Sequence, residues 1–292
     1  MSLLCVTGAR GLVGRALVDQ AVTAHTPLRA LSRAGGPARD GVDWVTGDLR
    51  RGVGAAALSG VQTVVHLAAQ TGAAAPEAYA EVNVEGTRAL LEAARTAGVR
   101  RFVFVSSIAV RFSSIADYPY AASKLEAERL VRASALEWVI VRPTLILGRG
   151  APNLDKLAGL ACLPMVPLPG GGKVRLQPVD VRDLAAVLLL AEQMPAGQVL
   201  EVGGPQTVSM ADLFRRIRVV KGKGGAPRLP IPLAPLRLMA GLLRAVLGDR
   251  SPVTAAQLSS FVEDAVAEPH PWVADRMAGF RDLDTTLRDA LA

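Results

Sequence analysis

Cysteine, histidine and aromatic residues are scarce in this sequence of 292 residues. Two cysteines cannot build a disulfide framework, and His25, His66 and His270 do not stand at the spacing of a metal-binding cluster, so we expect neither. Aromatic residues make up only 4% of the chain, whereas single-strand nucleic-acid binders stack bases on exposed rings. We therefore attribute the net charge of +7 to arginines spread over the surface, and expect no nucleic-acid partner.

Long apolar runs are also missing. The run around Leu188 is far shorter than the ~20 residues that a membrane-spanning helix needs, so no segment is expected to cross a bilayer. The N-terminus shows neither the basic segment nor the apolar segment of a secretory signal, because residues 3–6 lead directly into a glycine turn. These observations predict a cytoplasmic protein.

Short apolar runs alternate with amphipathic helical patterns through the first half of the chain. This alternation is typical of βαβ units and predicts an α/β fold, a Rossmann doubly wound parallel sheet covered by helices on both faces. The predicted strands span residues 3–7, 28–32, 43–46, 63–67, 101–106 and 138–142. The clearest predicted helices span residues 11–24, 80–97 and 120–133.

The pattern changes after Pro143, where prolines and the glycines at 170–172 predict a loop-rich excursion from the sheet. Regular structure is predicted to return with a turn and helix over residues 179–191 and a strand over residues 198–202. Helical patterns alternate with proline-rich sequence from Thr207 onward.

These patterns predict two regions. A dinucleotide-binding domain is expected over residues 1–150, and a smaller, mostly helical substrate-binding region over residues 151–292. Residues 175–205 are expected to return from that region to the Rossmann core.

Three glycines, Gly8, Gly11 and Gly14, follow the first predicted strand and open the first predicted helix. Without side chains, the backbone can approach a pyrophosphate closely while the helix N-terminus supplies N–H donors and partial positive charge. Arg10 and Leu12 stand in the same turn and belong to the predicted cofactor site. The alternative interpretation is a tight strand-to-helix turn without a ligand.

The end of the second predicted strand decides between the two dinucleotides. An acidic residue about 20 residues past the glycine turn would bind the ribose 2′-hydroxyl of NAD. This chain has Ser32 and Arg33 there, and a guanidinium suits the 2′-phosphate of NADP. Arg10 could reach the same group. The sequence therefore favours NADP over NAD, with a solvated loop cation as the alternative role of Arg33.

Tyr120 and Lys124 stand four apart on a predicted helix, so their side chains point the same way. A tyrosine with a pKa near ~10 is a poor base at neutral pH, but a neighbouring ammonium favours the phenolate. Ser107, just past the strand at 101–106, can hydrogen-bond a substrate carbonyl or hydroxyl. We predict hydride exchange between a nicotinamide and a carbonyl or carbinol carbon, with Tyr120 moving the proton.

Each of these residues also has a purely structural interpretation. Ser107 could terminate a strand, Tyr120 could be a helix-start residue, and Lys124 could pair with Glu128. If the structural interpretations were correct, all three residues would match the catalytic pattern by coincidence and in the correct order along one fold. Asn83 is either the organiser of a proton-relay water or a packing residue, and the sequence does not separate the two roles.

Several segments together resemble the extended and atypical branches of the short-chain dehydrogenase/reductase superfamily, over nearly the whole chain. The resemblance implies that Asp48, Leu49 and Ala68 contact the dinucleotide, that Ser107, Tyr120 and Lys124 form the catalytic triad, and that Lys124 also binds the cofactor. The segments are residues 7–14 (TGARGLVG), 47–49 (GDL), 66–69 (HLAA), 83–87 (NVEGT), 120–124 (YAASK), 141–143 (VRP) with Gly148, and 178–183 (PVDVRD).

One departure from the superfamily pattern concerns the loop before Tyr120. Nucleotide-sugar epimerases of this superfamily place about two dozen residues between the serine and the tyrosine. Here the interval from Ser107 to Tyr120 is 13, and the sequence after the serine contains Val110-Arg-Phe112. The short loop is similar to the atypical branch that includes the NAD(P)H-binding accessory subunit of respiratory complex I.

Three functions stay open at this point. The first is an NAD(P)-dependent oxidoreductase acting on a small or lipid-like substrate. The alternatives are a nucleotide-sugar epimerase/dehydratase and a catalytically silent protein that holds NADPH for a structural or assembly role. Residues 215–250 are strongly basic and include an apolar helix over 236–247, which suits a membrane surface but suits packing over the substrate pocket better. The sequence does not specify the oligomeric state.

Overall fold

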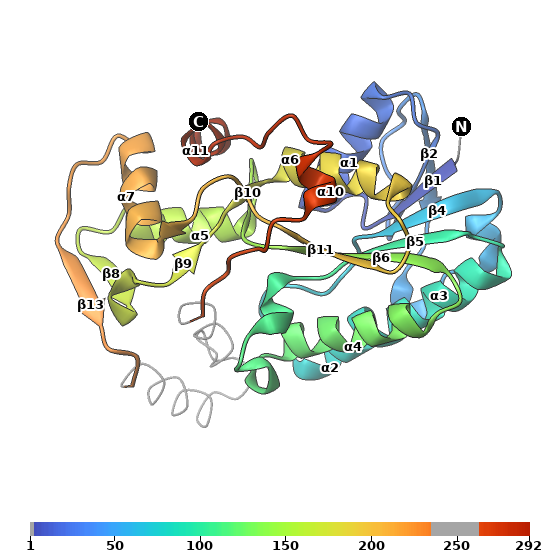
Figure 1. Cartoon of the computed structure of the whole chain (residues 1–292), viewed down its shortest axis with the longest axis horizontal. Coiled ribbons are helices and arrows are strands. Elements are labelled where there is room, and N and C mark those ends of the chain that lie inside the picture. The colour runs from blue at the N-terminus through green and yellow to red at the C-terminus, as the bar shows by residue number, and fades with distance from the viewer. Residues whose placement is uncertain (1–2, 235–262) are drawn as a thin grey trace.

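Parallel strands form the centre of the fold, as the alternating pattern predicts. The computed structural model describes residues 3–234 and 263–292, so the apolar helix expected over 236–247 lies outside the described residues. The central sheet consists of β1 (Leu3–Thr7), β2 (Leu28–Ser32), β3 (Val42–Thr46), β4 (Val61–His66), β5 (Arg101–Val105), β6 (Glu137–Pro143) and β11 (Gln198–Val202). Its order is β11-β6-β5-β4-β1-β2-β3, and every neighbouring pair is parallel (Figure 1). The Rossmann sheet is therefore confirmed.

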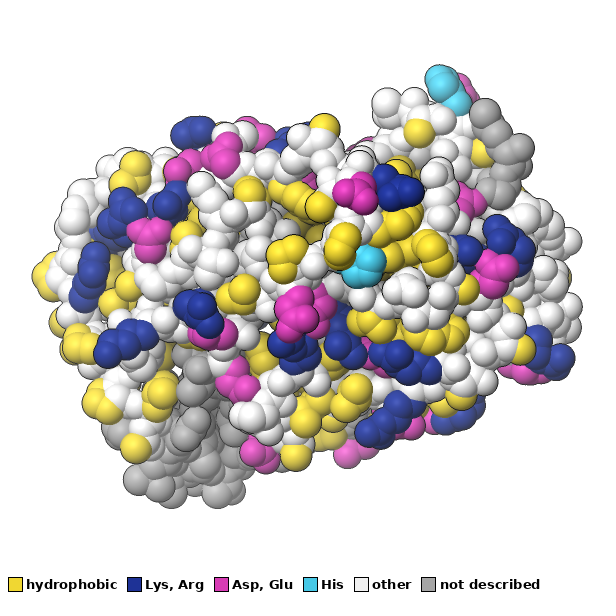
Figure 2. Space-filling view, viewed as in Figure 1, with side chains coloured by type: hydrophobic (Ala, Val, Ile, Leu, Met, Phe, Trp, Pro, Cys, Tyr) yellow, Lys and Arg dark blue, Asp and Glu magenta, His cyan; other side chains and the backbone are white. Residues whose placement is uncertain are grey.

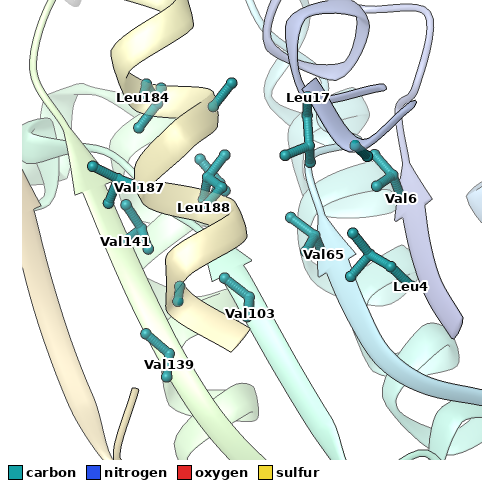
Figure 3. Close-up of a cluster of buried hydrophobic side chains, with 14 of the residues drawn as sticks. Leu4, Val6, Leu17, Val65, Val103, Val139, Val141, Leu184, Val187 and Leu188 are labelled. Atoms are coloured by element: carbon teal, nitrogen blue, oxygen red, sulfur yellow. The ribbon is translucent and has the colours of Figure 1, made fainter. Parts of the chain in front are cut away.

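Helices cover both faces of this sheet. Side chains of α1 (Leu12–Thr23) and α6 (Val181–Leu190) share one hydrophobic cluster with the strands, and those of α3 (Gly86–Thr96) and α4 (Pro119–Ala133) share another. In Figure 3, Leu17 of α1 and Leu188 of α6 lie against strand valines such as Val65. The adjacent Val64 belongs to the opposite cluster, since successive strand residues point to opposite faces. Both faces being buried explains the continuous apolar runs in the sequence.

The strand order reverses at β1, which has β2 on one side and β4 on the other. At such a switch point the connections leave in opposite directions and open a crevice beyond the carboxyl ends of the strands, where ligands bind in this type of sheet. The predicted cofactor and catalytic residues follow these strand ends.

The helix predicted over residues 80–97 begins earlier and is not regular. It starts with α2 (Pro76–Tyr79), continues through a π-helical segment (Ala80–Glu85) and becomes α3. Pro76 stands at the first turn, where its missing N–H costs no helical hydrogen bond. The π-helical segment holds Asn83, whose side chain is buried. Such segments are frequent at functional sites.

The prediction of a loop-rich excursion after Pro143 was wrong for part of this segment. α5 (Pro152–Ala161) and β8 (Val166–Pro169) form there. Pro152 is one of the prolines on which the loop prediction depends, but it occupies the first turn of α5, a position that proline tolerates. The glycines at 170–172 do break regular structure, each with a positive φ.

The C-terminal region combines helices with three pairs of short strands. β8 pairs with β13 (Arg228–Ile231), β9 (Arg175–Leu176) pairs with β12 (Val208–Ser209), and β7 (Ile146–Leu147) pairs with β10 (Val179–Asp180). Its further helices are α7 (Met210–Val220), α10 (Pro271–Ala274) and α11 (Leu283–Leu291). The proposed domain boundary near residue 150 stays a prediction.

A third hydrophobic cluster lies mainly within this region. It joins Leu154 of α5 and Phe214 of α7 to Phe112 and Ala121, which flank the loop before α4. The C-terminal region therefore packs directly against the segment between Ser107 and Tyr120. None of the described helices is long and apolar enough to span a bilayer.

Candidate active site

The glycine turn joins β1 to α1 and is closely packed. Gly8 has a φ of +67°, and a Cβ there would lie 2.7 Å from the Ala68 amide nitrogen. A Cβ on Gly14 would lie 2.3 Å from the Gly8 carbonyl oxygen. Gly11 caps α1 without a side chain, and the first turn of α1, which begins at Leu12, holds no acidic residue. The N–H groups of this turn therefore form a cradle that fits an anionic pyrophosphate.

Replacing Gly14 with alanine is expected to lower NADPH affinity at least about tenfold and to destabilise the protein by about 1–3 kcal/mol, because the added methyl overlaps the Gly8 carbonyl. Fluorescence titration with NADPH and thermal melting measure both effects. Gly159→Ala is the matched control, since a Cβ on that α5 residue meets no atom within 4 Å. An unchanged NADPH affinity in Gly14→Ala would exclude the cradle as the phosphate site.

A chain of hydrogen bonds connects the ends of β1 and β4 to the π-helical segment. The Thr87 hydroxyl donates to the Asn83 carbonyl at 2.7 Å, so it accepts from the Nε2–H of His66 at 3.0 Å. The His66 Nδ1 must then accept from the Thr7 hydroxyl at 2.7 Å, which itself accepts from the Ala68 N–H at 3.2 Å. Burial lowers the pKa of His66 to about 3. A neutral imidazole in one tautomer therefore fixes the floor of the crevice.

Asn83 extends this network to α4. Its Oδ1 accepts from the Gln70 N–H at 2.7 Å, and its Nδ2 donates to the Gln70 carbonyl at 3.1 Å and to the Ser123 hydroxyl at 2.9 Å. Ser123 in turn donates to the Tyr120 carbonyl at 2.7 Å. Both Nδ2 hydrogens are thus used by protein atoms, which favours the packing role that the sequence left open. Organisation of a relay water stays a prediction.

Ser107 and Tyr120 are brought together by the loop that links β5 to α4. Ser107 caps the 3₁₀ helix Ile108–Arg111 by accepting from the Ala109 N–H at 3.2 Å, and its side chain lies near enough to Tyr120 to affect the pKa of the phenol. Burial raises the pKa of Tyr120, whereas the neighbouring Ser107 side chain lowers it in part. The phenol is therefore protonated at neutral pH and can act as a proton donor.

Lys124 lies one turn beyond Tyr120 on α4 and is only 3% exposed. Its Nζ lies 4.2 Å from the centre of the Phe104 ring. Burial lowers the pKa of Lys124 to about 7, and the charge of Glu128 opposes this shift. The direct pair with Glu128 is not formed within the part of the chain described, because the Glu128 carboxylate binds Arg142 at 2.8 and 2.7 Å.

All three tyrosines of the chain lie together, which sequence reasoning missed. The ring of Tyr120 lies 6.2 Å from that of Tyr79 and 5.8 Å from that of Tyr118, measured between ring centres. The Tyr79 hydroxyl donates to the Gly72 carbonyl. Burial raises the pKa of Tyr118 as it does that of Tyr120. Two features of the sequence could have indicated this cluster: tyrosine is scarce in the chain, and Tyr118 stands two residues before Tyr120.

The residues predicted for the adenosine end surround the carboxyl ends of β2 and β3. Asp48 accepts from the Arg50 N–H at 3.1 Å and pairs with its guanidinium at 2.6 Å, which lowers the pKa of Asp48 to about 2. The Leu49 side chain is buried in the core, which leaves its backbone for a ligand. Arg10 and Arg33 are exposed at the glycine turn and just after β2.

Residues 4–203 match the model of the NAD dependent epimerase/dehydratase family. A ceramide reductase of Caulobacter vibrioides is 34% identical over 256 residues, covering 82% of this chain and 77% of that protein. A UDP-glucose 4-epimerase of Vibrio cholerae is 29% identical over 260 residues, covering 79% of each. A solved short-chain dehydrogenase/reductase superfamily protein from Agrobacterium tumefaciens, with bound NAD, is 26% identical with a TM-score of 0.63, covering 88% of this chain and 94% of that one.

The glycine cradle, the Tyr120 to Lys124 pair and the relatives agree with the superfamily resemblance drawn from the motifs, which is confirmed. The described residues contain no group of three or more His, Cys, Asp or Glu side chains that could hold a metal ion. The chain belongs to the NAD-dependent epimerase/dehydratase family.

Proposed function

We propose that this protein is an NAD(P)-dependent oxidoreductase that interconverts a carbonyl and a carbinol on a lipid-like substrate. The observation that carries the proposal is the placement of Tyr120 near the Ser107 side chain, with the buried Lys124 one helical turn away on α4. The similarity to a ceramide reductase supports the lipid-like substrate class.

Each group of site residues has a separate role in the proposed reaction. The cradle of Gly8, Gly11 and Gly14 would hold the dinucleotide, whose nicotinamide supplies or accepts the hydride when bound. Ser107 orients the substrate oxygen by a hydrogen bond. Tyr120 donates its phenolic proton to that oxygen during reduction, and the positive charge of Lys124 stabilises the resulting phenolate.

The proposal is tested with the purified full chain and NADPH against long-chain lipid ketones and short ketones, and in a separate assay with the oxidised cofactor against UDP-glucose. We expect NADPH oxidation with the long-chain ketones. Epimerisation of UDP-glucose in the assay with oxidised cofactor, with no net change in that cofactor, would instead support the second candidate, a nucleotide-sugar epimerase, which the Vibrio cholerae relative favours. Tight NADPH retention without turnover of any substrate would support the catalytically silent alternative.

The preference for NADP over NAD forms part of this proposal. No acidic side chain stands at the end of β2, where the Ser32 hydroxyl donates to the Gly35 carbonyl at 2.6 Å and Arg33 is exposed. A guanidinium there suits a 2′-phosphate.

Arg33→Ala is expected to weaken NADPH binding about 10- to 100-fold, the loss of a charge-assisted hydrogen bond, with little change for NADH. Dissociation constants for both cofactors measure this effect. Arg51→Ala, a nearby exposed arginine outside the predicted site, serves as the control. A wild-type protein that binds NADH more tightly than NADPH would contradict the assignment.

A further inference from the structure

Four large hydrophobic side chains are exposed in the described parts of the chain, and all four come from the C-terminal region. They belong to the α5–β8 connection, the end of α7 and β13. We call them the α7–β13 patch: Leu163 (43% exposed), Met165 (50%), Val219 (66%) and Leu229 (44%). Isolated exposed hydrophobic residues need no explanation, but a group of them marks an interaction surface.

Hydrogen bonds bring these segments together. The Arg218 guanidinium donates to the carbonyls of Ala161 at 2.7 Å and Leu163 at 3.1 Å, which attaches the end of α7 to the α5–β8 connection. β13 runs parallel to β8, with Leu229 opposite Pro167. Figure 1 shows α7, β8 and β13 together at the end of the molecule remote from α3.

This end of the molecule is also basic. Residues 213–231 contain six lysines and arginines and no acidic residue. Arg215 and Arg216 pair with acidic side chains, but Lys223 and Arg228 are exposed and form no ion pair with any residue in the described ranges. Figure 2 shows hydrophobic and basic side chains side by side at this end.

The chemistry of the patch fits a lipid surface better than a protein partner. Protein interfaces depend on tryptophan, tyrosine and arginine and are depleted in lysine, whereas this patch is aliphatic with a neighbouring free lysine. Aliphatic side chains enter the boundary between headgroups and acyl chains, and exposed Lys and Arg are attracted to anionic headgroups.

We propose that the α7–β13 patch docks this protein on an anionic phospholipid bilayer. Leu163, Met165, Val219 and Leu229 enter the headgroup boundary, and Lys223 and Arg228 contact the anionic headgroups. The inference does not depend on the proposed activity, although a lipid-like substrate would be found at the same surface.

Vesicle flotation of the full chain tests the proposal. We expect the wild type to float with vesicles of phosphatidylcholine and phosphatidylglycerol, more weakly with phosphatidylcholine alone, and less at high salt. Lys223→Glu/Arg228→Glu is expected to weaken binding at least about 25-fold, since each basic side chain near such a surface contributes about 5-fold. Leu163→Ser/Met165→Ser is expected to weaken it about tenfold or more, through the lost apolar burial.

The control is Arg95→Glu/Arg129→Glu, which makes the same change in net charge on α3 and α4. It should bind vesicles within about threefold of the wild type. Thermal melting verifies that all variants are folded. Absence of wild-type flotation with anionic vesicles, or wild-type binding by both patch variants, would overturn the proposal. So would a concentration-dependent dimer that the patch variants break without any vesicle binding, because a second copy would then cover the patch.

Discussion

Tyr120→Phe is expected to reduce turnover by about 10²- to 10⁴-fold, the usual contribution of a general acid, while the NADPH dissociation constant changes less than about threefold. The substitution removes only the phenolic hydroxyl group near Ser107. The ring keeps its contacts with Tyr79 and Tyr118, so the packing around residue 120 is retained. Steady-state kinetics with the substrate identified by the ketone panel, together with NADPH titration, separate the two effects.

Tyr118→Phe is the matched control for this prediction. It removes a hydroxyl from a neighbouring ring that is likewise partly buried, and it leaves the Tyr120 phenol in place. We expect a loss of less than about tenfold in kcat, because Tyr118 is not the assigned proton donor. Equal losses in both variants, or near-normal turnover in Tyr120→Phe, would show that the assigned donor is wrong.

The central sheet was predictable because its strands are continuous apolar runs bounded by turn residues. β1, β2 and β11 begin and end where the sequence predicts. β4 begins two residues earlier than predicted, because Gln62 interrupts the apolar run; its side chain is exposed and donates to the Gly60 carbonyl at 2.6 Å. A single polar residue at the solvent end of a strand thus conceals its start.

Two local features were not predictable from periodicity. In the π-helical segment at Ala80–Glu85 the backbone hydrogen bonds join residues five apart instead of four. This change alters the amphipathic pattern too little to be detected in the sequence. A proline breaks a helix in its interior but is tolerated in the first turn. The effect of Pro152 can therefore be predicted only when the first residue of α5 is known.

The candidate site was predictable as far as its residues are close in sequence. Tyr120 and Lys124 follow from helical spacing. The bond between Thr7 and His66 joins residues 59 apart and depends on the register in which β1 and β4 pair these two positions directly. Register of this kind arises from packing of both sheet faces, so no local motif reports it.

Lys124→Met is expected to abolish turnover and yet stabilise the free protein. Burial lowers the pKa of Lys124 to about 7, far below the ordinary value for lysine. The unfolded chain therefore binds more protons between about pH 7 and pH 10, and stability rises with pH across that window. Below pH 7 the burial of the charged Lys124 lowers the free energy of unfolding by its full amount, on the order of 5 kcal/mol. Loss of the contact with Phe104 offsets about 1–2 kcal/mol of the expected gain.

Urea unfolding of the wild type and of Lys124→Met at pH 6, 8 and 10 measures the difference between their free energies of unfolding. These pH values span the window from about pH 7 to about pH 10 in which the stability of the wild type changes. The difference should be largest at pH 6 and nearly vanish at pH 10. Lys156→Met, an exposed lysine on α5, controls for loss of a positive charge and should show no such trend. A Lys124→Met protein that is less stable than the wild type at pH 6 would contradict the argument. A buried lysine that destabilises the fold and lies one helical turn from Tyr120 fits the pattern expected of a residue kept for chemistry.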